Sequence, residues 1–236
     1  MSTAATELLY FYDQTLTNSK ARVKHINLAD GGLAVILDQT VFYVQGGGQP
    51  GDRGTISSQD SAFSVQKTFR DADGNVVHLG QFTGGEPFPV ESEVHLEVDK
   101  AVRQEHTRLH SAGHLIHLAV WNTGLQWDPC KSCHFPGACC VEYNIENSKA
   151  HDDVRALQVQ IQQEFDRLVQ ADLAVMITIE GDAANGRYGL PLRQISFAGK
   201  AQRSCGGTHV PSTLHLHGIT ITKLKIKNGI CKVNYQ

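Results

Sequence analysis

Two short motifs in this sequence carry side chains that bind metal ions. His106 and His110 are four positions apart in His-Thr-Arg-Leu-His, and Cys205 and His209 have the same spacing in Cys-Gly-Gly-Thr-His. Residues four apart on a helix project from one face, so the two histidines can bind a single ion. The glycines of the second motif let its backbone bend around that ion. Three imidazoles and a thiolate are ligands that zinc favours, so the sequence predicts a zinc site built by all four residues.

The first motif lies in a stretch with helical periodicity. Residues 99–123 are predicted to form a helix that Asp99 caps and Gly124 ends. Its apolar stripe comprises Val102, Leu109, Gly113, Ile116 and Val120, and His106, His110, His114 and His117 border that stripe. We expect His114 and His117 to be hydrogen-bonded histidines at the edge of the core, because surplus histidines are commoner than additional ligands.

Two threonines adjoin the predicted ligands. Thr107 follows His106, and Thr208 precedes His209. Their hydroxyls are suited either to lining a pocket and binding water or to capping the local backbone, and the sequence leaves both roles open. Four protein ligands also describe a closed structural zinc site, whereas catalytic zinc usually keeps an open position. The role of the ion therefore stays open as well.

A glycine-rich stretch precedes both motifs. Gly46, Gly47, Gly48 and Gln49 belong to Val-Gln-Gly-Gly-Gly-Gln-Pro-Gly-Asp-Arg-Gly, which lacks the GxxxxGK[ST] pattern of a nucleotide P-loop. Composition alone fits the tip of a long hairpin as well as it fits a functional loop.

The stretches HTRLHSAGHLIH, SCGGTHV and GGGQPGDRG occur in one chain, and this combination resembles the AlaX family of free-standing alanyl-tRNA editing proteins. That family is similar to the editing domain of alanyl-tRNA synthetase. The resemblance implies an aminoacyl-tRNA hydrolase that uses zinc to deacylate seryl- or glycyl-tRNA(Ala), with contacts near the acceptor end of the tRNA. It makes His106, His110 and Thr107 the candidate catalytic residues, and Gly46, Gly47, Gly48, Gln49 and Thr208 the candidate substrate-binding residues.

Other functions remain open beside this one. One is editing of another mischarged tRNA, such as seryl-tRNA(Thr). Another is a non-catalytic, zinc-containing module that binds tRNA or a protein partner. Nucleotide or ATP binding is expected only through similarity to the family.

Composition limits the setting of the protein. The formal net charge of the 236 residues is −3, so any tRNA contact must come from local basic patches. No apolar run approaches the roughly 20 residues of a membrane span, and residues 1–10 lack a signal-peptide pattern. We therefore expect a cytoplasmic protein without membrane contact, and the sequence does not indicate its oligomeric state.

The predicted fold class is α+β. Residues 1–98 contain short alternating runs separated by Asp-Gly and Gly-Gly turns, which predict a small β-barrel domain. Residues 99–236 are predicted to form the metal-binding editing domain, with the His-bearing helix and a second helix over residues 150–171 packed on an antiparallel sheet. Strands are expected near residues 8–12 and 139–145, and from Leu214 onward.

Four cysteines lie between the two predicted helices. Cys130, Cys133 and His134 form a CxxCH pattern, with Cys139 and Cys140 nearby. Haem attachment is disfavoured because it belongs to exported proteins, and the βαβ setting of a thioredoxin-like site is missing. Reduced, structural cysteines in a loop are favoured over a second zinc site.

Basic residues alternate with apolar ones near the end of the chain. Lys223, Lys225 and Lys227 share one face of a predicted strand, and Lys232 lies on the next strand. A solvated outer face and a contact with the tRNA backbone both remain open.

Overall fold

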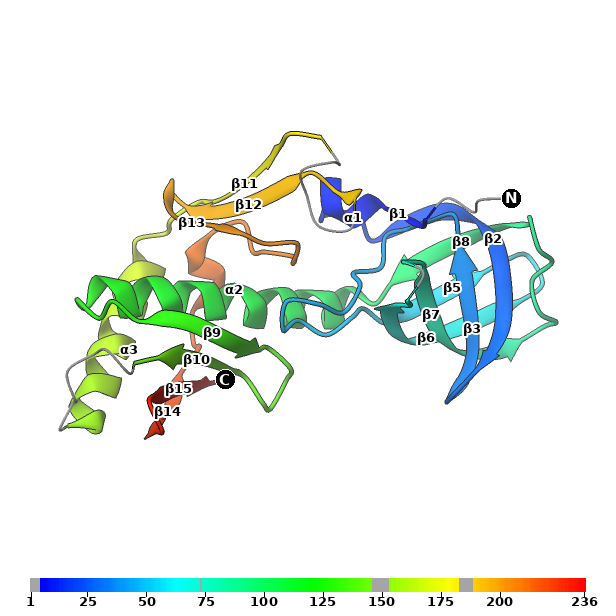
Figure 1. Cartoon of the computed structure of the whole chain (residues 1–236). Helices are drawn as coiled ribbons and strands as arrows, with labels where there is room; N and C mark the ends of the chain where they lie inside the picture. Colours follow the sequence, from blue (N-terminus) through cyan, green and yellow to red (C-terminus); the bar gives the residue numbers. More distant parts are fainter. Residues whose placement is uncertain (1–4, 73, 146–152, 183–188) are drawn as a thin grey trace. The chain divides into compact units, whose positions relative to one another are not determined.

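The structure is a computed structural model that describes residues 5–72, 74–145, 153–182 and 189–236. Within these ranges the chain forms three α-helices and many short strands, six of which close into a barrel (Figure 1). This content is consistent with the predicted α+β class. No helix in the described ranges has both the length and the apolar character needed to span a bilayer.

The chain divides into two compact units. Unit 1 comprises Met1–Gly46 and Pro50–Gln104, and unit 2 comprises Gly47–Gln49 and Glu105–Gln236. The division thus falls inside the His-bearing helix, and three residues of the glycine-rich stretch group with unit 2.

Unit 1 is built around the closed barrel, in which neighbouring strands run antiparallel. In order around the barrel, the strands are β2 (Asn18–Ala29), β3 (Gly32–Leu37), β7 (Val76–Gly84), β6 (Ala62–Arg70), β5 (Gly54–Ser57) and β8 (Glu93–Val98). Strand β8 shows the sequence pattern behind this arrangement: Val94, Leu96 and Val98 are buried, and the residues between them are exposed. Because side chains alternate along a strand, the apolar half fills the barrel interior.

The start of the chain differs from the predicted strand over residues 8–12. A two-residue strand, β1 (Glu7–Leu8), pairs in parallel with β4 (Gln39–Thr40), and the chain then turns into the short helix α1 (Leu9–Tyr12). Consecutive residues of α1, Tyr10 and Phe11, are both buried. A strand with one exposed face would bury only every second side chain, so the strand prediction was wrong here.

A buried ion pair fixes the end of the glycine-rich stretch within unit 1. The Arg103 guanidinium donates to both carboxylate oxygens of Asp52, with Nε at 2.8 and 3.0 Å, and its Nη2 also donates to the Val41 carbonyl at 2.7 Å. The Tyr43 backbone N–H donates to the same carboxylate at 2.7 Å. Asp52 therefore has a structural role, because these partners satisfy a charge that would be costly to bury alone.

The His-bearing helix, α2 (Lys100–Asn122), agrees with the predicted range. The Asp99 carboxylate accepts from the N–H groups of Ala101 and Val102 at 3.0 and 3.1 Å, so Asp99 is the predicted cap. Gly124, with φ of 84°, follows the last turn in the left-handed conformation that glycine tolerates.

Unit 2 contains two antiparallel sheets and two long helices, α2 and α3 (Val154–Gln170). The four-stranded sheet has the order β14 (Ile221–Lys227), β15 (Ile230–Tyr235), β10 (Cys140–Asn144) and β9 (Asp128–Cys133). The three-stranded sheet has the order β11 (Val175–Glu180), β12 (Leu192–Phe197) and β13 (Lys200–Ser204). Buried side chains from the helices and both sheets, such as Leu115, Phe165, Phe197 and Val233, form one hydrophobic cluster.

Two predictions for unit 2 were wrong, and one lies partly outside the described residues. The CxxC segment is strand β9, although a loop was expected there. A 3₁₀ helix, η3 (Thr213–Leu216), replaces the first part of the strand expected from Leu214 onward, whereas the later part of that prediction is strand β14. Gly218, with φ of 85°, separates η3 from β14. Residues 150–152 of the predicted second helix are not described, and α3 begins after its cap, Asp153.

Candidate metal centre

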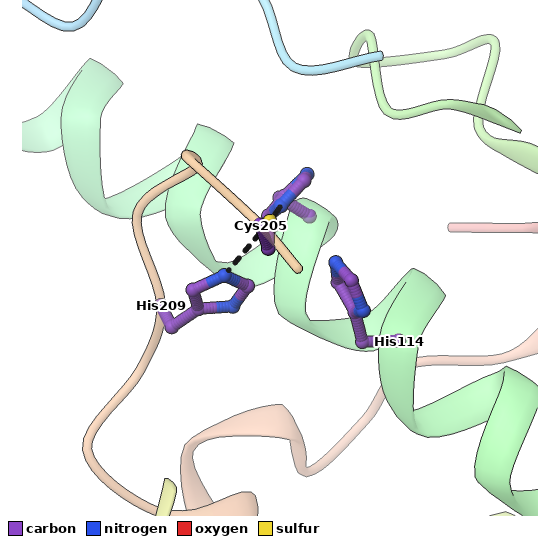
Figure 2. Close-up of side chains that lie close together, drawn as sticks. His114, Cys205 and His209 are labelled. Atoms are coloured by element: carbon purple, nitrogen blue, oxygen red, sulfur yellow. Dashed lines mark hydrogen bonds between the residues drawn. The ribbon is translucent and has the colours of Figure 1, made fainter. Parts of the chain in front are cut away.

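Four side chains from α2 and the loop after β13 bring metal-binding atoms together. His110, His114, Cys205 and His209 each offer one donor atom, and these atoms lie within 4.8 Å of one another. The Cys205 Sγ is 3.1 Å from the His110 Nε2 and 3.3 Å from the His209 Nε2. Figure 2 shows His114 on the helix and Cys205 and His209 on the loop, with the three side chains converging.

The donor group fits a zinc ion in chemistry and in size. Zinc binds thiolate at about 2.3 Å and imidazole at about 2.1 Å, so a tetrahedral shell places the sulfur and each nitrogen about 3.5 Å apart. The two sulfur–nitrogen distances at Cys205 are slightly shorter than this. Imidazole nitrogen and cysteine thiolate are both donors that zinc binds. Small outward shifts of the side chains would therefore suffice to hold the ion.

The donor group differs from the predicted ligand set at one position. It includes His114, which was expected to be a core-edge histidine, and it does not include His106. A helix advances by about 100° per residue, so side chains eight residues apart point about 80° apart and do not face the same ion. His110 is four residues from both histidines, and the sequence therefore contained a second HxxxH pair, His110 and His114, as a signal for the observed set.

The path of the Cys-Gly-Gly-Thr-His loop along α2 explains the choice of His114. The Thr208 hydroxyl lies 2.6 Å from the Thr107 hydroxyl, and the Val210 N–H donates to the Ser111 hydroxyl at 3.1 Å. The loop thus runs in the same direction as the helix. His209, between these two contacts, reaches the turn formed by residues 110–114, and its ring centroid is 5.1 Å from that of His114.

Arg193 holds the same loop from the side of β12. This buried residue donates through Nη1 to the carbonyls of Cys205 and Gly207, both at 2.8 Å. A guanidinium with fixed geometry can bind two carbonyls at once, which fixes the curvature of the loop between them. Nothing in the local sequence around Arg193 predicted this contact.

Burial controls the protonation of the donor group. It lowers the pKa of His110 and of His209 well below the ordinary value, and the neighbouring histidines and Arg193 lower both further. Burial and then His134 lower the pKa of His114 to about 3. Burial raises the pKa of the Cys205 thiol, although the Gly207 N–H opposes this. The imidazoles are therefore in their neutral, metal-binding form, and binding of a cation is expected to release the thiol proton.

The glycine-rich stretch reaches this group through Gln49. The Gln49 side-chain amide donates to the Thr208 hydroxyl at 2.9 Å, and its oxygen accepts from the Thr208 N–H at 3.1 Å. Gln49 is fully buried, and a Cβ added at Gly207 would lie 2.9 Å from its oxygen and 2.8 Å from the His110 Cδ2. These contacts place Gln49 beside the donor group as a support for the loop.

The three glycines before Gln49 have different surroundings. Gly46 accepts a hydrogen bond from the Tyr43 hydroxyl at 2.9 Å within unit 1. In unit 2, a Cβ added at Gly47 would lie 4.0 Å from the His110 ring, and one at Gly48 would lie 2.7 Å from the Ser132 carbonyl. Only glycine fits at Gly48, because the φ angle there is also positive, at 79°.

His134 is a neighbour of the donor group that sequence reasoning did not assign. Its ring centroid is 4.8 Å from that of His110, and its Nδ1 lies 2.5 Å from the Tyr235 hydroxyl. Tyr235 in turn donates to the Leu109 carbonyl at 2.9 Å. Burial lowers the pKa of His134 to about 4, so this ring is neutral near pH 7. The histidine of the CxxCH pattern was the only signal for this residue.

The remaining cysteines form no second metal-type group with other described residues. Cys133 lies opposite Cys140 on neighbouring strands, and the Cys130 and Cys139 thiols each donate to a backbone carbonyl. Among the described residues, the group around His110 is the one place where three or more His, Cys, Asp or Glu donors meet. The cysteines of this sheet are free thiols.

Comparison with known proteins identifies relatives of the chain. Residues 3–102 match the family described as tRNA synthetases class II (A). The chain is 30% identical over 234 residues to alanine–tRNA ligase 1 of Lachnoclostridium phytofermentans, covering 93% of the chain and 26% of the ligase. It spans about a quarter of the length of this and similar alanine–tRNA ligases.

Two shorter relatives come from Pyrococcus horikoshii. The chain is 33% identical over 208 residues to the alanyl-tRNA editing protein AlaX-M, and the aligned region covers 87% of the chain and 85% of AlaX-M. It is 27% identical over 234 residues to AlaX-L, which covers 94% of the chain and 55% of that protein. The chain is therefore a relative of the class II tRNA synthetases, and it shares a segment with alanine–tRNA ligases. Within this class, the chain belongs to the AlaX family of alanyl-tRNA editing proteins.

Proposed function

We propose that this protein is an aminoacyl-tRNA hydrolase that removes a small, wrong amino acid, serine or glycine, from tRNA(Ala). The observation that carries the proposal is the group of three imidazoles and one thiol within 4.8 Å, formed by a helix and a loop distant in sequence. The relationship to AlaX-M supports the choice of substrate.

His110, His114, Cys205 and His209 would hold a zinc ion. When bound, zinc lowers the pKa of a coordinated water towards about 7 and polarises a carbonyl oxygen. Arg193 keeps two carbonyls of the loop in place, so that Cys205 and His209 face the helix. The low pKa values of the three histidines favour their neutral form and so remove competition between protons and the ion.

The Thr107–Thr208 pair would supply a hydrogen-bond donor to the substrate. Thr208 accepts a hydrogen bond from Gln49, and the two threonine hydroxyls share one proton between them over 2.6 Å. Each hydroxyl has a single proton, so whichever threonine accepts in that contact keeps its own proton free for another acceptor. A donor fixed in this way suits the hydroxyl of a serine side chain, so it distinguishes serine from alanine but does not distinguish glycine from alanine.

A second function is favoured by the number of donors. Four protein ligands complete a tetrahedral shell, as in structural zinc sites. Hydrolysis by a coordinated water would require a fifth ligand or the departure of one of the four. If neither occurs, the protein would be a zinc-stabilised module that binds tRNA without cleaving its ester.

The test is release of labelled amino acids from charged tRNAs by zinc-loaded protein. We expect release from seryl- and glycyl-tRNA(Ala), little release from alanyl-tRNA(Ala), and loss of activity in Cys205→Ala. Seryl-tRNA(Thr) tests the tRNA preference. Absence of release from every substrate by protein with a full zinc complement would reject hydrolysis in favour of the binding module. Full activity of Cys205→Ala without bound metal would reject the role of zinc.

The proposal includes a two-domain arrangement, with a barrel domain over residues 1–98 and an editing domain over residues 99–236 in which α2 and α3 pack on an antiparallel sheet. The closed barrel and the shared hydrophobic cluster of the helices and sheets support it. Cytoplasmic location and ATP binding stay predictions.

A further inference from the structure

The four-stranded sheet of unit 2 has one buried face and one basic face. Leu224, Val233 and Val141, which face each other across three strands, are buried in the hydrophobic cluster. The opposite face carries Lys131, Lys223, Lys225, Lys227 and Lys232, which together we call the lysine face. The register adds two carboxylates, Glu142 and Asp128, to this side of the sheet. The five lysines therefore leave it with a net positive charge.

The register places like charges next to each other on this face. Lys225 lies directly opposite Lys232, and Lys232 lies opposite Glu142 on the next strand, with which it forms an ion pair at 3.1 Å. Like charges directly opposite on paired strands are unfavourable. Lys223, Lys225 and Lys227 are exposed and form no ion pair with any residue in the described ranges. Their charge is therefore available to an anionic partner.

A cavity of about 470 Å³ lies at one end of the lysine face. Lys223, Lys225 and Lys232 line it together with Thr222 and Asn234, and Gly137, Ala138 and Cys139 line it as well. Three ammonium groups, an amide and a hydroxyl thus border one concave surface. Such donors suit phosphate oxygens, because the negative charge of a phosphate group attracts the compact positive charge of an ammonium group.

We propose that the lysine face binds the phosphodiester backbone of RNA. Among the described residues, the strand register places no aromatic side chain on the same side of the sheet as these lysines, which argues against base stacking and for contacts to the backbone that do not depend on sequence. The net charge of the whole chain is −3, so electrostatic attraction to RNA must come from a local patch such as this one. The identity of the RNA as tRNA rests on the proposed function.

The same sheet is joined to the helix that carries the metal-type donors. Tyr235, at the end of β15, donates to the Leu109 carbonyl next to His110 and also contacts His134. RNA held on the lysine face would therefore be bound to a sheet that is fixed to α2.

The experiment measures binding of uncharged tRNA(Ala) over a series of salt concentrations. The test variant is Lys223→Glu with Lys225→Glu. The matched control is Lys67→Glu with Lys200→Glu, which changes the net charge equally at exposed sites on strands β6 and β13, outside this sheet. We expect the test variant to bind at least about tenfold more weakly at low salt, with a salt-dependence slope smaller by about 1.5 to 2. The control should bind within about twofold of the wild type, because its lysines contact no phosphate.

Equal affinity of the test variant and wild type would overturn the proposal, and so would an equal loss in both variants, which would indicate a general charge effect. Binding of the wild type to anionic vesicles but not to tRNA would assign the face to a membrane surface instead. Far-UV circular dichroism and zinc content verify that both variants fold. Because the measurement uses uncharged tRNA, failure of ester hydrolysis in the separate release assay leaves its result unaffected.

Discussion

At the scale of single residues, His110 has one histidine a turn before it and another a turn after it. Only His114 shares the donor group with His110, Cys205 and His209. We expect His114→Ala to lower zinc content well below about one ion per chain, since a tetrahedral site loses one of four ligands. His106→Ala should retain zinc, and metal analysis of the purified variants measures both. Zinc loss in His106→Ala with retention in His114→Ala would restore the ligand set predicted from sequence.

The sequence predicted a group of metal-type donors but not all the members of the group that the structure brings together. Residue types and four-residue spacing were enough to predict a zinc-type centre that includes His110, Cys205 and His209. The choice between His106 and His114 depends on where the loop meets the helix, through Thr208 at Thr107 and Val210 at Ser111. These contacts join residues about a hundred positions apart, and local periodicity carries no information about them.

His78, in the barrel, is a buried histidine outside the donor group. Its Nδ1–H donates to the Val35 carbonyl at 3.0 Å, and its Nε2 accepts from the Thr40 hydroxyl at 2.8 Å. Burial lowers the pKa of His78 from 6.5 to about 4, with the bond to Val35 opposing the shift. The unfolded chain thus binds a proton between pH 6.5 and 4 that the folded chain does not bind. Stability from this residue is present above pH 6.5 and is lost as the pH falls towards 4.

The loss from His78 should reach about 3 kcal/mol at pH 4, from roughly 1.4 kcal/mol per unit of pKa. Urea unfolding at several pH values measures it, and His78→Gln serves as the comparison because glutamine is neutral throughout. We expect the stability difference between wild type and variant to shrink on acidification. A difference that is constant from pH 7 to 4 would show that His78 does not titrate in this window.

At the scale of elements, the loop between β13 and η3 packs against α2 through a glycine. A Cβ at Gly207 would overlap the His110 ring and approach Gln49, whereas a Cβ at Gly206 would meet nothing within 4 Å. We expect Gly207→Ala to weaken zinc binding at least about tenfold, in the range seen when groups that orient a ligand are altered. Gly206→Ala is the matched control and should bind zinc like the wild type. Competition with a chelator of known affinity measures both, and equal affinities would show that the loop moves freely.

The long helix with a clear apolar period was predicted correctly, whereas some of the short elements were not. Helix α2 has a 3.6-residue apolar stripe, a cap at Asp99 and a glycine after its end. Strand β9 (Asp128–Cys133) is mostly exposed, so no apolar alternation marks it, and it pairs because β10 provides an edge. Leu214 and Leu216 alternate as in a strand but form a 3₁₀ turn. The Thr213 hydroxyl donates to the Leu168 carbonyl of α3, and the Thr213 N–H donates to the Leu173 carbonyl, and these bonds hold the start of this turn in place.

At the scale of the whole molecule, both tryptophans of the chain, Trp121 and Trp127, belong to unit 2. Tryptophan fluorescence therefore reports on the unit that contains the donor group. We expect a zinc chelator to lower the midpoint of thermal unfolding followed by this signal, because free zinc at about 1,000 times its dissociation constant stabilises the folded state by about 4 kcal/mol. The same chelator should leave the midpoint of Cys205→Ala unchanged. An equal shift in both proteins would indicate that the chelator acts elsewhere.

The course of the chain between the units has a consequence for inheritance. The chain leaves unit 1 for residues 47–49, which belong to unit 2, and then returns to unit 1. Within unit 2, the Gln49 side chain forms hydrogen bonds with Thr208, which is 159 positions away in the sequence. Recombination that replaces the first hundred residues of one relative with those of another would exchange one partner of this contact without the other. A side chain lacking the amide would leave the buried Thr208 N–H unsatisfied, at a cost of about 1 to 3 kcal/mol. Positions 49 and 208 are therefore expected to change together among relatives. The segments that encode the barrel and the metal-binding unit are expected to be inherited together.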